Sequence, residues 1–177
     1  MVGREKEIRR ITVIGAIVNI ILTVFKIIAG IFGRSAAMVA DGIHSLSDLL
    51  SDIVVIVFTH ISSKEKDRNH SFGHGKFETL ATLIVSVILV VVGARLMTNG
   101  VKYIISILNG NTFPSPGSIA LWAAAISIIL KEVLYHVTIH TARKVNSPVL
   151  SANAWHHRSD AFSSIGALVG IGGAMII

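Results

Sequence analysis

The stretch that decides the fold is ITVIGAIVNIILTVFKIIAGIF, which runs from Ile11 to Phe32 and contains a single charged residue, Lys26. An α-helix rises about 1.5 Å per residue, and the hydrocarbon core of a bilayer needs roughly 20 residues to cross it. The stretch is therefore long enough and apolar enough to predict a membrane-spanning helix.

The segment before this stretch is charged and contains Arg4, Lys6, Arg9 and Arg10, so the N-terminus superficially looks like a signal peptide. A signal peptide has an apolar region of only about 7–15 residues, followed by a cleavage site with small residues. The run here is longer and has no obvious cleavage site. We interpret it as an uncleaved spanning helix.

Further apolar stretches follow along the chain, and the composition fits a membrane protein. Of the 177 residues, 52% are hydrophobic and only 15% are charged, which is too apolar for an ordinary soluble domain. The sequence predicts one all-α, polytopic transmembrane helix bundle over residues 1–177, with five helices at about 11–33, 36–60, 77–98, 118–141 and 149–177.

The breaks between these stretches carry turn residues, and Ser147 followed by Pro148 predicts the N-cap and first turn of the last helix. That helix reaches Ile177 inside an unbroken apolar run with no polar flank. Either the chain ends there or, as we expect, a further helix follows Ile177.

Positive charge is distributed unevenly among the connections and predicts the topology. Four basic residues precede the first stretch, four lie between the second and third, and two follow the fourth, whereas the opposite connections hold few. The positive-inside rule then places the N-terminus in the cytoplasm. The net charge of +6 belongs to these flanks and is not interleaved with aromatic residues, so a nucleic-acid partner is not expected.

Two histidine–aspartate pairs are the candidate functional residues. His44 and Asp48 lie four residues apart in the second stretch, and His156 and Asp160 have the same spacing in the fifth, so each pair shares a helix face. Counting from the helix ends, both pairs reach the middle of the membrane from opposite sides. Ionisable groups at that depth are costly and are expected to be paired inside the bundle.

One reading of these pairs is a hydrogen-bond network that only holds helices together. A matched pair on each of two helices favours a metal site instead, because two imidazoles and two carboxylates form a tetrahedral ligand set suited to Zn²⁺. The chain has no cysteine, so no thiolate competes for this role.

Three segments, DGIHSLSD (41–48), HSFGHGKFE (70–78) and NAWHHRSD (153–160), resemble the signatures of the cation diffusion facilitator family. The resemblance implies a proton-coupled antiporter that works as a homodimer, with six membrane helices and a C-terminal cytosolic metal-binding domain. The sixth helix and that domain are missing from these 177 residues.

The resemblance also implies a second metal site in the connection between the second and third helices, formed by Asp67, His70 and His74. In this family, His-x-x-x-Asp on both helices is similar to zinc-transporting members, whereas carboxylate-rich versions go with manganese or iron.

The resulting hypothesis is Zn²⁺ efflux coupled to protons, through a mid-membrane site shared by the second and fifth helices. The protein would be a multi-pass component of the cell (inner) membrane. Zinc would be a transported substrate, with Mn²⁺, Fe²⁺, Cd²⁺ or Co²⁺ as alternative cargo. Another alternative is a metal-binding membrane subunit that transports nothing. An enzyme is not expected, since the His-Glu-x-x-His motif of zinc hydrolases is absent.

Several other polar residues in the apolar stretches have more than one possible interpretation. Lys26 is expected to snorkel or to pair inside the bundle. Asp41 and Asp52 could line an ion path or simply be hydrated. Glu132 is expected to pair with Lys131 or with a cation of another helix, and His157 to orient or pack rather than to bind metal.

Overall fold

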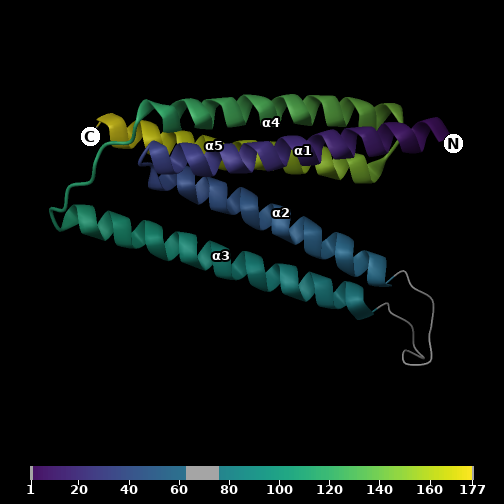
Figure 1. Cartoon of the computed structure of the whole chain (residues 1–177), viewed down its shortest axis with the longest axis horizontal. Helices are drawn as coiled ribbons and strands as arrows, with labels where there is room; N and C mark the ends of the chain where they lie inside the picture. Colours follow the sequence, from purple (N-terminus) through teal and green to yellow (C-terminus); the bar gives the residue numbers. More distant parts are fainter. Residues whose placement is uncertain (1, 63–75, 177) are drawn as a thin grey trace. The chain divides into compact units, whose positions relative to one another are not determined.

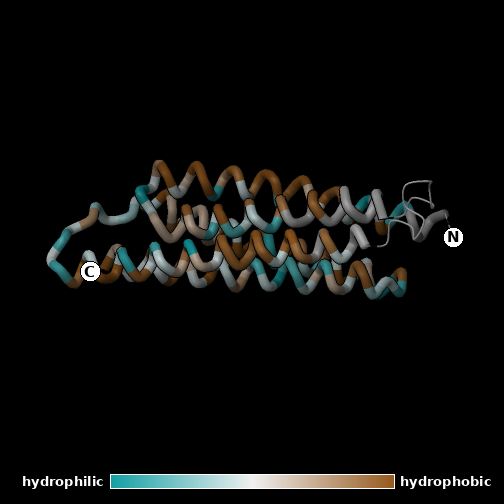
Figure 2. The backbone as a smooth tube through the Cα atoms, turned by 90° about the horizontal axis from the view of Figure 1, so that it is seen from below, coloured by the Kyte–Doolittle hydropathy of each residue, from teal (hydrophilic) through white to brown (hydrophobic). Residues whose placement is uncertain are grey.

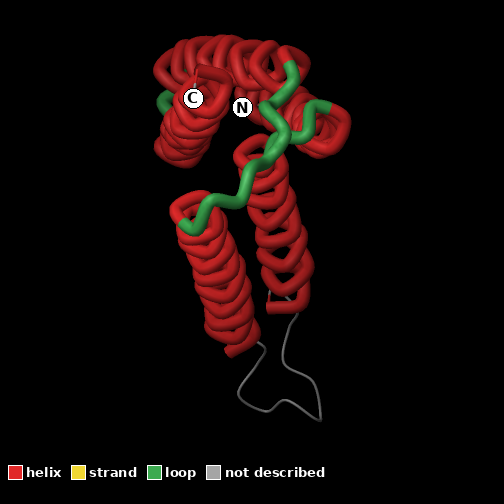
Figure 3. The backbone as a smooth tube through the Cα atoms, turned by 90° about the vertical axis from the view of Figure 1, so that its left-hand side faces the viewer, coloured by secondary structure: helices red, strands yellow, loops and turns green. Residues whose placement is uncertain are grey.

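The described part of the chain consists almost entirely of helices, as Figure 1 shows. The structure is a computed structural model that describes residues 2–62 and 76–176, and within these ranges it contains no strand (Figure 3). The all-α prediction is confirmed. The helices are α1 (Val2–Phe32), α2 (Ala36–Ser62), α3 (Lys76–Leu108), α4 (Ser118–Lys144) and α5 (Pro148–Ile176).

Two helices are longer than the apolar stretches from which they were predicted. α1 begins at Val2 rather than near residue 11, and α3 continues to Leu108 rather than ending near residue 98. Hydropathy marks the part of a helix that suits the hydrocarbon core, whereas helical hydrogen bonding can continue through polar residues. At the predicted end of α3, the hydroxyl of Thr98 donates to the carbonyl of Ala94 at 2.9 Å, so this polar side chain is satisfied within the helix.

Four helical segments in the described part of the chain are long and apolar enough to cross a membrane: Lys6–Phe32, Leu83–Leu108, Ser118–Lys144 and Pro148–Ile176. Helix α2 is not among the four. Most side chains in the second half of α2 lie outside the described residues. The helices nevertheless form the multi-pass pattern of an integral membrane protein.

The chain divides into two compact units, and the boundary falls inside α2. Unit 1 contains α1, the beginning of α2 through Ser45, α4 and α5. Within it, α4 lies beside both α1 and α5 and runs antiparallel to them (Figure 1). Unit 2 spans Leu46–Phe113 and contains the rest of α2 and α3.

The core of unit 1 is built largely from alanine. A buried cluster joins residues from all four of its helical segments: Ala29, Met38, Ala120, Ala123, Ala124 and Ile171. Small side chains let helix backbones approach closely, which is how helices pack when the surrounding lipid is as apolar as the core. A second buried cluster, of Tyr135, Ile139 and Ala154, joins α4 to α5.

Two tight turns set the helix order in unit 1, and each contains a residue in the left-handed region. Arg34 has a φ of 49° in the turn between α1 and α2, and Asn146 has the same φ between α4 and α5. Each turn ends in a serine N-cap: Ser35 accepts a hydrogen bond from the Met38 amide at 3.2 Å, and Ser147 accepts one from the Leu150 amide at 3.3 Å. The predicted cap at Ser147 is confirmed.

Unit 2 presents long apolar side chains on the surface of α3. Val90, Met97 and Leu108 are each at least 68% exposed. Figure 2 shows hydrophobic residues distributed along the length of the helices. Such a surface is stable in contact with lipid and costly in water.

Candidate metal site

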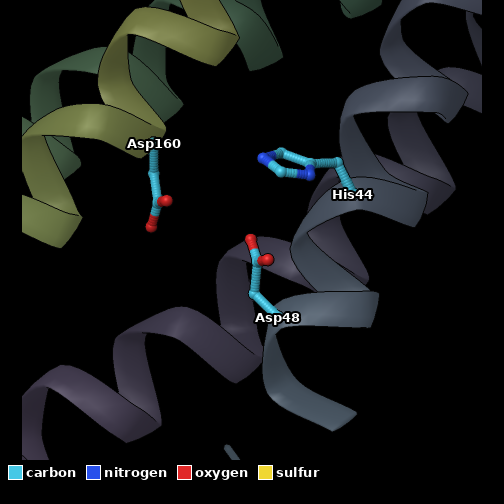
Figure 4. Close-up of side chains that lie close together, drawn as sticks. All are labelled: His44, Asp48 and Asp160. Atoms are coloured by element: carbon cyan, nitrogen blue, oxygen red, sulfur yellow. The ribbon is translucent and has the colours of Figure 1, made fainter. Parts of the chain in front are cut away.

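The centre of the candidate site is formed by three of the predicted ligands. One nitrogen of His44 and one carboxylate oxygen each of Asp48 and Asp160 lie within 4.8 Å of one another. Figure 4 shows the three side chains close together. His44 and Asp160 both belong to unit 1, and Asp48 lies one turn after His44 in the same helix. Asp160 is buried, and the other two are half-buried.

The local sequence explains why these side chains share one place. The four-residue spacing of His44 and Asp48 stacks them on one face of α2, since a helix turns once in 3.6 residues. Asp160 comes from α5. An imidazole nitrogen and two carboxylate oxygens are donors that divalent transition metals accept, and the two negative charges offset the charge of the ion.

His156, the fourth predicted ligand, is not in this group. Its side chain is 45% exposed, and its Nδ1 lies 3.9 Å from the Oδ1 of Asp160, one turn further along α5. The structure therefore brings His156 next to one ligand of the cluster but not into the cluster itself.

The second predicted site, Asp67, His70 and His74, lies outside the described residues, as does the side chain of Asp52. This site stays a prediction.

A lysine that the sequence analysis did not connect with the site contacts one of its ligands. The Nζ of Lys131, in α4, donates to Asp160 Oδ2 at 2.6 Å and to Asn19 Oδ1 at 2.7 Å. The sequence offers Lys131 as one of two partners for its neighbour Glu132, the other being a cation of another helix. The available signal was its position: Lys131 lies in the middle of the apolar run of α4, where a charged side chain needs an opposite charge inside the bundle.

A second buried lysine forms a separate network next to the site. Lys26 Nζ lies 2.9 Å from Asp41 Oδ2 and donates to the hydroxyls of Ser164 at 2.9 Å and Ser45 at 3.2 Å. The Ser164 hydroxyl in turn donates to Asp41 Oδ2 at 3.0 Å. The expectation that Lys26 pairs inside the bundle is confirmed. Asp41, whose role was open, is a buried ion-pair partner.

Glu132 of α4 pairs with a cation of α5. Glu132 Oε1 lies 3.6 Å from Arg158 Nε of α5, and its Oε2 lies 3.7 Å from His136 Nε2. Of the two partners predicted for Glu132, the structure therefore shows the cation of another helix. Arg158 also lies over the ring of Tyr135 at 4.6 Å.

His157 is 1% exposed, and neither of its ring nitrogens has a hydrogen-bond partner among the described residues. It packs against α1, where a Cβ added at Gly15 would lie 3.3 Å from its Nε2. These contacts fit the expected packing role.

Comparisons with known proteins assign the chain to a family. The family model of the cation efflux transmembrane domain matches residues 12–177. The manganese efflux system protein MneP of Bacillus subtilis is 38% identical over 168 residues, which cover 95% of this chain and 55% of the relative. The magnetosome protein MamM of Magnetospirillum gryphiswaldense is 37% identical over 166 residues, covering 94% and 51%. The metal tolerance protein C1 of Arabidopsis thaliana is 36% identical over 186 residues, covering 98% and 39%.

The chain thus spans about half the length of the first two of these relatives and less of the third. The family model nevertheless covers α1 from residue 12 onward, the other four helices and every residue of the candidate site. The resemblance inferred from the three sequence segments is confirmed: this chain is a multi-pass membrane protein that belongs to the cation efflux, or cation diffusion facilitator, family.

Proposed function

We propose that residues 1–177 form the membrane domain of a divalent-metal efflux transporter. The observation that carries this proposal is the cluster of His44, Asp48 and Asp160, whose ligand atoms lie within 4.8 Å of one another. The chain that bears this cluster belongs to the cation efflux family. Three convergent ligands of this kind, borne by apolar helices, are more than helix packing requires.

Zinc is the first candidate for the transported ion. In the proposed loaded state, His156 rotates toward Asp160 and adds a second imidazole, which completes a tetrahedral set of two nitrogens and two oxygens. The present distance of 3.9 Å between His156 Nδ1 and Asp160 Oδ1 supports this step, because the imidazole already lies beside the carboxylate whose ion it would share.

Manganese is the second candidate, and two observations favour it. Two of the three clustered ligands are carboxylates, which are the harder donors that Mn²⁺ accepts. In addition, one relative that is 38% identical to this chain is named as a manganese efflux protein.

Exchange with protons follows from the chemistry of the ligands. Imidazole and carboxylate bind a metal only when deprotonated, so protons entering from the acidic side compete with the ion and promote its release. We propose that the ion enters from the cytoplasm, the side of the basic N-terminal segment, and leaves on the other side. A homodimer in the cell membrane is part of the same proposal and rests on the family resemblance.

The test is transport by the purified protein in proteoliposomes, with Zn²⁺ and Mn²⁺ supplied separately and a pH-sensitive dye inside. Metal flux accompanied by opposite proton flux is expected, and Asp160→Ala should abolish both. Glu132→Gln is a matched control, because Glu132 is an acidic residue that contacts α5 through Arg158 but lies outside the cluster. Metal binding without flux would instead favour a non-transporting metal-binding subunit.

A further inference from the structure

The feature that the proposed function does not explain is a cation already bound to one of the candidate ligands. Lys131 is 3% exposed and reaches Asp160 from α4, and its second contact is the neutral side-chain amide of Asn19 from α1. All three residues belong to unit 1. Lys131 is therefore a buried positive charge whose neutralising contact is a residue that the metal would also bind.

The other buried lysine provides a comparison within the same unit. Lys26 also pairs with a buried carboxylate, but its partner Asp41 lies outside the metal cluster. Lys26 additionally has two hydroxyl contacts, from Ser45 and Ser164. Lys26 has the contacts of a structural ion pair, whereas Lys131 shares its carboxylate with the candidate ion site.

The net charge of the site shows how sharing Asp160 with Lys131 affects metal binding. With Lys131 present, the two carboxylates of the cluster and the ammonium carry a net charge of about −1 before metal binds and +1 afterwards; without the ammonium these values become −2 and 0. A cation within about 5 Å of the bound ion weakens its binding substantially, because charges interact strongly where water is scarce. The same cation stabilises the Asp160 carboxylate while no metal is bound.

We propose that Lys131 is an internal counter-cation that competes with the transported metal for Asp160. In the metal-free state it holds the Asp160 carboxylate in place through the contact with Oδ2. When the metal binds, Lys131 gives up its contact with Oδ2 and keeps its contact with Asn19. Its repulsion lowers the affinity of the loaded site and so speeds release of the ion. This inference rests on the proposed function, and it identifies Lys131 as a positioning residue for transport rather than a ligand.

The test measures metal affinity and release in the purified protein at pH 8, where protons compete weakly for the ligands. Dissociation constants for Zn²⁺ and Mn²⁺ are measured by calorimetry, and release is followed by stopped-flow mixing with a chelator. Lys131→Met should bind metal at least about tenfold more tightly and release it correspondingly more slowly, because a nearby like charge has been removed. Lys131→Arg, which keeps the charge, should stay near the parent.

Lys26→Met is the matched control, because it also removes a buried lysine from a carboxylate. It should lose stability without binding metal more tightly. A purely structural role for Lys131 would leave affinity unchanged or weaken it, so tighter binding is the discriminating sign. If Lys131→Met does not fold, Lys131→Gln gives the same test, since its amide can still donate to Asp160 without a charge.

The inference is wrong if the neutral variants bind metal with the parent affinity or more weakly. That result would leave the proposed function intact as long as the parent binds metal and Asp160→Ala does not. If the parent itself binds neither ion, the proposed function fails as well, so the two failures are distinguishable.

Discussion

Replacing Lys26 by methionine tests whether the ion pair with Asp41 stabilises unit 1. The two side chains are 1% and 3% exposed and their charged atoms lie 2.9 Å apart. At an effective dielectric constant of about 20, this separation corresponds to roughly 6 kcal/mol of attraction, part of which offsets the cost of removing both charges from water. Methionine leaves the Asp41 carboxylate buried, with one hydroxyl donor, Ser164, among the contacts described above.

Removing one partner of a buried ion pair typically costs about 3–5 kcal/mol. For a chain of this length, that loss corresponds to a decrease in Tm of roughly 6–20 °C. Thermal unfolding of the purified protein in detergent, followed by intrinsic tryptophan fluorescence, measures it. The double variant Lys26→Met/Asp41→Asn removes both charges and should recover most of the loss. A decrease below about 2 °C for the single variant, or a double variant as unstable as the single one, would refute the reasoning.

Three further predictions concern topology, the shared ion and selectivity. Single cysteines at Ser115 and Asn146, at opposite ends of α4, should react with an impermeant thiol reagent from opposite sides, with Asn146→Cys labelled from the cytoplasm; labelling of both from one side would overturn the proposed orientation. Asp48→Ala and Asp160→Ala should each nearly abolish flux, and the double variant should be scarcely worse, because groups acting on one ion do not contribute independently; additive losses would rule out a shared ion. His44→Asp should shift the ratio of Zn²⁺ to Mn²⁺ transport toward Mn²⁺, since a hard oxygen replaces a nitrogen; an unchanged ratio in a competition assay would mean that His44 does not bind the ion.

Much of the fold could be predicted from the sequence because membrane helices impose simple constraints. Each span needs about 20 apolar residues, and turn residues separate the spans, so the number and order of helices followed directly. The ends of α1 and α3 were less predictable. Helical hydrogen bonds continue through Thr98 and through the charged N-terminal segment, and hydropathy alone does not report this continuation.

The candidate site was predictable to the extent that it depends on helical spacing. The pair on α2 follows from a four-residue step, and Asp160 follows from the equivalent pair on α5. The position of His156 and the partner of Lys131 depend instead on side-chain rotamers and on which helices are neighbours. Glu132 illustrates the difficulty, because it pairs with Arg158 of α5 although Lys131 is its immediate neighbour in the sequence.

Gly30 and Gly33 lie at the end of unit 1 that contains the turn between α1 and α2. Their contacts affect how an ion could pass there. A Cβ added at Gly30 would lie 2.7 Å from the backbone nitrogen of Val39, and one added at Gly33 would lie 2.8 Å from the Cβ of Ala120. These two contacts involve a backbone atom and an alanine side chain, neither of which has an alternative rotamer, and the Val39 and Ile119 side chains lie almost as close. Rotation of a side chain does not relieve these two contacts. A path through this end therefore requires whole helices to separate. Replacing either glycine by a larger residue should hinder that movement without changing a metal ligand.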